Sequence, residues 1–466
     1  MKTKTKVFLL LLNELHNSNM QFYNNLLIFG RFLYLFYIFL SESCKFHFNN
    51  FIYYYFTKLP TLERLELIKS ITYKLEDLNI VYVKIFQSLC LEKNILYDNE
   101  KDYLLKYIDN VPYKSEEVDY ELLHLIESKY NIRLEDNEPI NSGIIGIVFK
   151  GLYGNANDSK VVIKILKNDI EKKLNSAFNE IEHLTYIISY IPFLNNLNLH
   201  KLFLDNKESL LNQVNFIKEV TNIEIFRFKN QNLQEYRIPY VYKEITNIYN
   251  NVIVMENIKG LTIDNVKNYD LDTKEEFAKL FQKFGYISIL YNSAIHNDLH
   301  AGNIFFYIND TNSGLPKYQL GLIDFGICCF PSKNNQNSYY YFFYEMNINK
   351  KFDNEDKINE LLNVIIEEKD KLNNLKNTNF EKYKKLVNNS IKILKKYSAL
   401  DILCDFFIDL ALLFKKFNFN LSKEFNQICF GLKTVESVIN TLSYNNMKIQ
   451  NEIMKEFTQI NKLITI

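Results

Sequence analysis

Two short stretches decide the fold of this 466-residue chain: residues 296–303, HNDLHAGN, and residues 322–326, LIDFG. Asp298 can orient a hydroxyl group or a water molecule and accept its proton. Asn303 and Asp324 offer the hard oxygen donors that Mg²⁺ prefers. The apolar residues before each stretch predict short buried strands that hold both loops rigidly. The pattern therefore predicts a site for Mg²⁺-dependent phosphoryl transfer.

The order and spacing of these stretches resemble those of kinase-like phosphotransferases, in which an Asp and an Asn five residues apart precede a strand ending in Asp-Phe-Gly. We expect an α+β fold of the two-lobed protein-kinase type, with a helical N-terminal extension and a helical C-terminal tail. Two alternatives are less favoured. One is an acidic surface turn beside an unrelated strand. The other is a zinc site on His296 and His300, although His296 fits the structural histidine of such a loop better.

Composition limits the classes of function. Lys and Arg number 55 and Asp and Glu number 55, so the formal charge is zero and no nucleic-acid partner is expected. Hydrophobic residues make up 47% of the chain, which is ordinary for a globular protein. The six cysteines show neither disulfide nor metal spacing, which indicates a reducing intracellular compartment.

The N-terminal region, residues 1–60, contains the apolar run 26–40, LLIFGRFLYLFYIFL. Its 15 residues fall short of the roughly 20 that span a bilayer. A buried helix is the favoured interpretation, and an interfacial helix at a membrane or a true span stays open. Residues 61–132 have mostly helical periodicity and form the expected extension.

A small lobe is expected over residues 133–260. Gly143 and Gly146 lie in a turn before a strand, where glycine lets backbone amides approach phosphate oxygens. A second apolar strand ends in Lys164, which can grip phosphates. The lysine needs a carboxylate partner, and spacing alone favours Glu180 over the more distant Glu219.

The large lobe and its tail are expected over residues 261–466. The helical periodicity is clear up to residue 290, and the tail is helical to its end. The apolar run 400–414 is too short, and too interrupted by Asp, to span a membrane. No Ala-Pro-Glu signature follows Gly326, so the peptide-docking segment of ordinary protein kinases is missing.

From about residue 61 to residue 330, the chain resembles the UbiB-type atypical kinases, which support coenzyme Q biosynthesis. Residues 84–87, KIFQ, are similar to that family's Lys-x-Gly-Gln signature, with Phe86 in place of glycine. Residues 213–219, QVNFIKE, resemble its Glu-x-Asp segment followed by the glutamate partner of the lysine, with amides in place of both acids. This resemblance shifts the choice of partner to Glu219.

The resemblance implies an atypical kinase or ATPase with ATP and Mg²⁺ as cofactors. It also implies a lipid or quinone-precursor ligand and peripheral association with a membrane. The implied catalytic residues are Asp298, Lys164 and Glu219, and the implied metal ligands are Asn303 and Asp324. The implied nucleotide contacts are Gly143, Gly146, Val148, Lys164, Met255 and Glu256, with Lys84 and Gln87 lying over the site. Two alternatives stay open: a hydroxyl kinase of the aminoglycoside or choline type, and a nucleotide-binding scaffold with weak activity.

Overall fold

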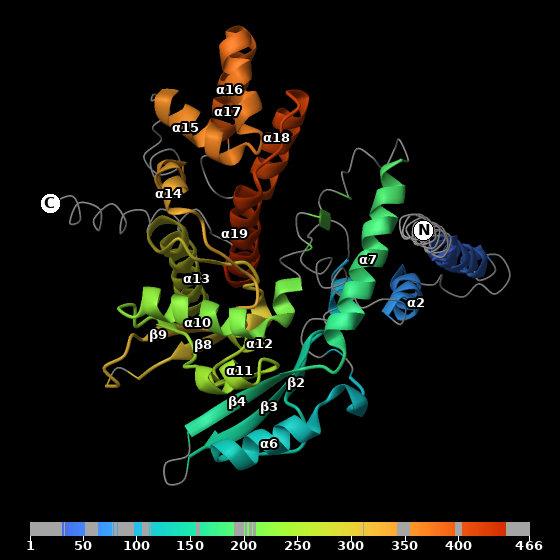
Figure 1. Ribbon diagram of the computed structural model, residues 1–466, viewed down its shortest axis with the longest axis vertical. Helices are drawn as coiled ribbons and strands as arrows, with labels where there is room; N and C mark the ends of the chain where they lie inside the picture. The colour runs from blue at the N-terminus through green and yellow to red at the C-terminus, as the bar shows by residue number, and fades with distance from the viewer. Residues whose placement is uncertain are drawn as a thin grey trace, which may run out of the picture. The chain divides into compact units, whose positions relative to one another are not determined.

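A computed structural model describes most of the chain between residues 30 and 443 (Figure 1). The described residues are 30–31, 33–51, 64–76, 78, 82, 97–104, 111, 113–154, 159–190, 200, 203–204, 207, 211–310, 312–342, 355–396 and 403–443. The chain falls into two compact units, and each is described by itself. The first comprises Met1–Asp119, Asn141–Ile147 and Leu166–Leu211, and the second comprises Tyr120–Ile140, Val148–Ile165 and Asn212–Ile466.

The first unit is mostly helical. Its elements are α2 (Arg64–Glu76), α4 (Asp98–Leu104), the 3₁₀ turn η2 (Ser115–Glu117), β2 (Asn141–Ser142) and α7 (Ile170–Ser189). Arg64 holds α2 against α4, because its guanidinium donates hydrogen bonds of 2.7 and 2.8 Å to the buried carboxylate of Glu100. β2 enters the expected glycine turn, which the Gly143 N–H closes by donating to the Gly146 carbonyl at 2.8 Å.

Residues 30–51, apart from residue 32, form a helix in the first unit. One side of it packs, since Ile38 is buried and the Glu42 carboxylate accepts a 2.6 Å hydrogen bond from Lys74. Most of its large apolar side chains are exposed, unlike those of a helix buried in a core. Within the described part of the chain, no helix is long and apolar enough to cross a bilayer. Residues 26–29 and 32 of the apolar run lie outside the described residues.

The second unit begins with α6 (Tyr120–Tyr130) and carries the main sheet. The strands run in the order β1 (Ile132–Leu134), β3 (Gly146–Tyr153), β4 (Ser159–Leu166) and β6 (Val252–Glu256). Alternate side chains of β4 are buried, namely those of Val161, Ile163 and Ile165. Because side chains alternate across a strand, Lys164 leaves β4 on the opposite face, and it pairs in register with Ile253 of β6.

Two smaller sheets hold the two stretches that the sequence singles out. β7 (Ile295–His296) pairs with β10 (Cys328–Cys329), and a three-stranded sheet has the order β5 (Tyr236–Arg237), β9 (Tyr318–Leu322) and β8 (Ile304–Ile308). Residues 297–303 join β7 to β8, and residues 323–327 join β9 to β10. Because β8 pairs with β9 and β7 with β10, the two connections are fixed beside each other.

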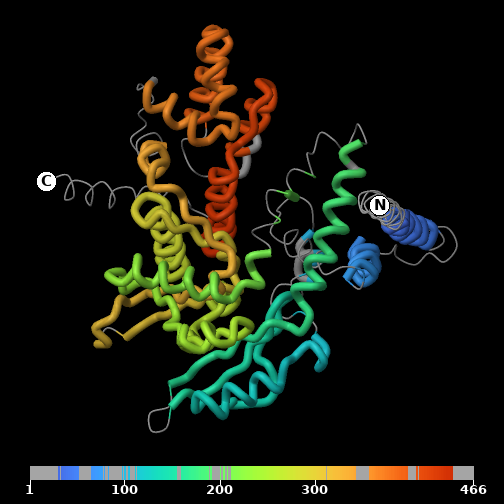
Figure 2. The backbone as a smooth tube through the Cα atoms, in the orientation of Figure 1, coloured from blue at the N-terminus to red at the C-terminus, as the bar shows by residue number. Residues whose placement is uncertain are grey.

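Helices make up the rest of the second unit. They are α10 (Phe216–Asn230), α11 (Lys243–Ile248), α12 (Ile263–Val266), α13 (Leu271–Ile287), α14 (Lys333–Tyr340), α15 (Glu355–Ile365), α16 (Lys369–Thr378), α17 (Phe380–Lys396), α18 (Leu403–Lys416) and α19 (Lys423–Leu442), with the short turns η3 (Asn212–Val214), η4 (Ser288–Asn292) and η5 (Ala301–Asn303). The tail helix α19 packs along α13 (Figure 2). Phe277, Phe281 and Phe284 of α13 are buried, as their helical spacing predicts. The expected α+β fold is confirmed, and the tail is helical over its described residues, whereas residues 444–466 lie outside the described part of the chain.

Candidate active site

A buried histidine holds the loop that follows β7. His296 is 1% exposed, and its Nδ1 accepts the backbone N–H of Asp298 at 3.1 Å. Its Nε2 therefore carries the proton and donates to the carbonyl of Ile323 at 3.2 Å. Burial lowers the pKa of His296 to about 4. His296 is a neutral side chain that joins the Asp298 loop to the residue before Asp324.

Asn303 makes a second link between the two connections. Its Nδ2 donates to the Asp298 carbonyl at 2.8 Å, and its backbone carbonyl accepts the Ile323 N–H at 3.1 Å. The first bond turns the NH₂ group of the amide toward the protein. The amide oxygen Oδ1 is consequently the Asn303 atom that remains available to a ligand.

Lys164 of β4 meets two carboxylates. Its Nζ lies 2.8 and 3.0 Å from the two carboxylate oxygens of Glu219, which is 1% exposed. The same Nζ lies 3.3 Å from Oδ1 of Asp324, whose side chain is 41% exposed. It also lies over the ring of Phe216, 5.4 Å from the ring centroid. The small-lobe lysine and the Asp of Asp-Phe-Gly are thus joined by an ion pair.

The electrostatics divide the two carboxylates into different roles. Burial raises the pKa of Glu219 to about 7, although the charge of Lys164 opposes the rise. Burial also works to raise the pKa of Asp324, but the charge and hydrogen bond of Lys164, together with the two nearby histidines His296 and His300, bring that pKa down to about 2. Burial disfavours the ammonium of Lys164, yet Asp324 and Glu219 together raise its pKa above the usual value. Asp324 is therefore the ionised, accessible carboxylate, and Glu219 is the buried one that orients the lysine.

The helix α10 is anchored to Asp-Phe-Gly by contacts that sequence reasoning missed. The Asn222 side chain donates from Nδ2 to the Phe325 carbonyl at 2.8 Å, and both residues are buried. The Phe325 ring lies 5.0 Å from the ring of Phe226 and 4.7 Å from that of His296. Asn222 follows Glu219 by three residues, so both point the same way from α10. The sequence feature that could have drawn attention to Asn222 is a polar residue on the buried face of an amphipathic helix.

The two candidate partners of Lys164 lie in different places. Glu219 contacts the lysine, whereas Glu180 of α7 forms an ion pair with Arg31 within the first unit. Spacing alone therefore favoured the glutamate that pairs with Arg31, whereas the resemblance of residues 213–219 favoured the one that contacts Lys164. Asn215 of that segment caps α10, because its side chain accepts the Lys218 N–H at 2.9 Å.

The other predicted nucleotide contacts are spread over both units. Gly143 and Gly146 form their turn in the first unit. Val148 of β3 is half-buried in the second unit, where Met255 and Glu256 end β6. In register, Met255 pairs with Val162, two residues before Lys164. Lys84 and Gln87 lie outside the described residues.

The residues present suit a magnesium ion held jointly with a nucleotide. Mg²⁺ is commonly bound by one or two carboxylates together with substrate phosphates and water. Asp324 supplies an ionised carboxylate and Asn303 supplies an amide oxygen, on two connections that share hydrogen bonds. Among the described residues, no group of three or more His, Cys, Asp or Glu side chains could hold a metal without such help. This donor set therefore fits a nucleotide-linked Mg²⁺ better than zinc.

The fold and these side chains define a kinase-like protein. A family model described as the ABC1 atypical kinase-like domain matches residues 118–359, just over half of the chain. The chain belongs to this family, which includes the UbiB-type kinases.

Relatives with similar sequences carry names from the same family. The "Probable protein kinase UbiB" of Shewanella piezotolerans is 26% identical over 241 residues, covering 50% of this chain and 43% of the relative. The protein of the same name from Glaesserella parasuis serovar 5 is 28% identical over 280 residues, covering 56% and 48%. The chain thus matches less than half the length of these relatives.

Solved structures also show similarity. The Rv3197–erythromycin complex from Mycobacterium tuberculosis matches with 14% identity and a TM-score of 0.39, covering 66% of this chain and 77% of that one. The Rio2 kinase from Chaetomium thermophilum matches with 11% identity and a TM-score of 0.28, covering 56% and 74%.

Proposed function

We propose that this chain binds Mg²⁺ and ATP, and that it transfers or hydrolyses the terminal phosphate beside Lys164, Asp298 and Asp324. The observation that carries the proposal is the contact of one ammonium with both Glu219 and Asp324, at 2.8 and 3.3 Å. A lysine held in this way is oriented for phosphate oxygens, as in protein kinases. The family to which the chain belongs supports the same chemistry.

Each residue has a distinct task in the proposed reaction. Lys164 contacts phosphate oxygens while Glu219 fixes its direction. Asp324 and the amide oxygen of Asn303 hold the metal ion, which neutralises charge on the transferred phosphate. Asp298 orients the attacking hydroxyl group or water and accepts its proton. His296 keeps the Asp298 backbone in place through its 3.1 Å hydrogen bond.

The acceptor is proposed on the family resemblance. The relatives are named as probable protein kinases, but the missing Ala-Pro-Glu signature leaves this chain without an obvious peptide platform. We therefore propose a lipid or prenyl-quinone precursor as the acceptor or activator. The exposed apolar side chains of helix 30–51 support contact with a membrane surface, where such molecules reside.

The proposal is tested with γ-labelled ATP and the full chain, assayed alone, with vesicles, and with quinone-precursor-like phenols. We expect phosphate release that vesicles and phenols increase. Asp298→Asn should lower it by about 10²- to 10⁴-fold while nucleotide still binds. The control is Asp310→Asn, because Asp310 is an exposed residue after β8. Wild-type turnover by Asp298→Asn would refute the assignment, and a phosphorylated soluble metabolite would instead identify a small-molecule kinase.

A further inference from the structure

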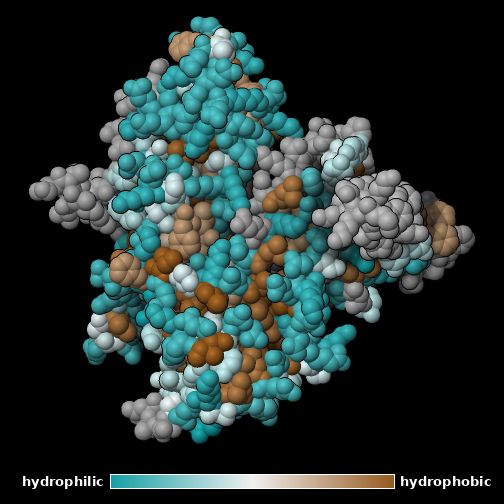
Figure 3. All heavy atoms as spheres, viewed as in Figure 1, coloured by the Kyte–Doolittle hydropathy of each residue, from teal (hydrophilic) through white to brown (hydrophobic). Residues whose placement is uncertain are grey.

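Positive charge is concentrated in one part of the tail. The whole chain is formally neutral, but residues 369–396 hold nine lysines against two acidic residues, Asp370 and Glu381. These residues form α16 and α17, which lie beyond the family match at residues 118–359. Figure 3 shows hydrophilic side chains gathered over this part of the second unit. Such a local excess of one sign attracts partners of the opposite sign.

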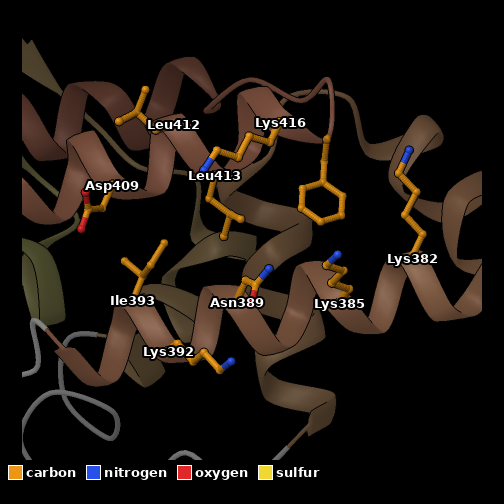
Figure 4. Close-up of a pocket in the computed structure, with 10 residues that line it drawn as sticks. Lys382, Lys385, Asn389, Lys392, Ile393, Asp409, Leu412, Leu413 and Lys416 are labelled. Carbon is orange, nitrogen blue, oxygen red and sulfur yellow. The ribbon is translucent and has the colours of Figure 1, made fainter.

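A groove of about 730 Å³ lies between α17 and α18 (Figure 4). We call it the lysine groove, and its lining residues are Lys382, Lys385, Asn389, Lys392, Ile393, Asp409, Leu412, Leu413, Lys416 and Phe417. Ile393 and Leu413 point from the two helices into the space between them. Leu413 is buried and Ile393 is half-buried, so the floor of the groove is apolar and recessed.

The cations at the rim of the lysine groove are not neutralised. Within the described residues, no carboxylate pairs with the ammonium groups of Lys382, Lys385, Lys392 or Lys416. The single acidic residue of the lining, Asp409, lies 2.9 Å from Lys396, which is not part of the lining. Four unpaired cations around an apolar floor favour a ligand that presents carboxylates beside apolar side chains.

We propose that the lysine groove docks an acidic amphipathic helix of a partner protein. From Lys382 to Ile393 the groove follows about 16 Å of helix axis at 1.5 Å per residue, which is about three turns of a docked helix. Such a helix inserts apolar side chains at every third or fourth position and places its acids against the rim. A flat membrane surface would meet the rim lysines without reaching the recessed floor. This docking does not depend on nucleotide binding at the active site.

A library of random 16-residue peptides displayed on phage tests the proposal on the full chain. Selection is followed by binding measurements with the selected synthetic peptides on two matched double variants. Lys382→Glu with Lys385→Glu reverses two lining charges. Lys384→Glu with Lys395→Glu makes the same charge change on α17 outside the lining. Circular dichroism checks that both variants fold.

We expect the selected peptides to be acidic, with apolar residues three or four positions apart. Their affinity should fall about tenfold or more in the lining variant and stay close to the wild-type value in the matched variant. Ile393→Ser should also weaken binding, since it removes an apolar contact. The proposal is overturned if both double variants lose affinity equally or if the selected peptides are not acidic. It is also overturned if only phosphatidylserine-containing vesicles bind in a manner that depends on Lys382 and Lys385.

Discussion

At the scale of single residues, the centre of the candidate site is the ammonium of Lys164, which contacts the carboxylates of both Glu219 and Asp324. Glu219 is buried and Asp324 is partly exposed, so only Asp324 is placed to meet a metal ion. In the proposed reaction, Glu219 acts on the nucleotide through Lys164. It is a positioning residue.

Changing the glutamate that orients Lys164 should weaken nucleotide binding. Glu219→Gln keeps the size of the side chain and removes its charge, so the lysine loses a charge-assisted hydrogen bond worth about 1.5–3 kcal/mol. We expect the Kd for Mg²⁺-ATP to rise by about 10-fold to 100-fold, as measured by isothermal titration calorimetry. Glu180→Gln is the matched control, because Glu180 pairs with Arg31 instead. A larger effect of Glu180→Gln would contradict the assignment.

His296 should remain neutral at mildly acidic pH. Its folded pKa of about 4 lies below the value of about 6.5 expected in the unfolded chain. The unfolded state therefore binds the proton more readily, and stability present above pH 6.5 is lost as the pH falls toward 4. The full loss is about 3 kcal/mol. Imidazole ¹⁵N spectra at pH 5, assigned with His296→Gln, should show the neutral Nε2–H tautomer. An imidazolium signal from His296 at that pH would show that the ring is not buried as described.

At the scale of elements, the tail helix α19 packs against β7 and Asn297, directly before Asp298. A Cβ added to Gly431 would lie 2.5 Å from Oδ1 of Asn297 and 2.6 Å from Cγ2 of Ile295. Non-bonded heavy atoms do not approach so closely, so the side chains of Asn297 and Ile295 would have to shift to admit any side chain at residue 431. Asn297 immediately precedes Asp298, and any shift of one moves the other.

Gly431→Ala should therefore lower activity, although alanine is the better helix former. We expect a loss of stability of about 1–3 kcal/mol from overpacking and a fall in kcat of about 10-fold to 100-fold. Adding Asn297→Ala should restore part of the loss, because it removes the atom nearest to the new methyl group. Full activity in Gly431→Ala would show that the packing of α19 does not control the position of the loop that contains Asp298.

Local patterns predicted much of the fold and only part of the site. The helix carrying Phe277 and Phe281 could be predicted, because its buried residues repeat with the helical period. The strand before Asp324 could be predicted as a short, mainly apolar run, and its last four residues are buried one after another. The contact between Asn222 and Phe325 could not be predicted, since it joins residues 103 positions apart and the position of Asn222 on the buried face of α10 does not identify its partner. The same holds for Gly431, whose close approach to Asn297 depends on how two distant elements pack.

At the scale of the whole molecule, the kinase-like domain and the lysine-rich helices occupy different parts of the chain. The family match ends at residue 359, and the lysine groove lies in the helices that follow it. The Lys164 site and the lysine groove belong to the same compact unit. A partner bound in the groove would therefore be tethered to the unit that carries the proposed catalytic residues.

The central claim is that Asp324 holds Mg²⁺ for a nucleotide, and thermal unfolding with and without Mg²⁺-ATP tests it most directly. Wild type and the exposed control Asp310→Asn should gain about 2.7 kcal/mol at a ligand concentration about one hundred times the Kd. Asp324→Asn should lose the part of this gain that depends on Mg²⁺. An equal Mg²⁺-dependent gain in Asp324→Asn, or no gain in wild type, would contradict the account.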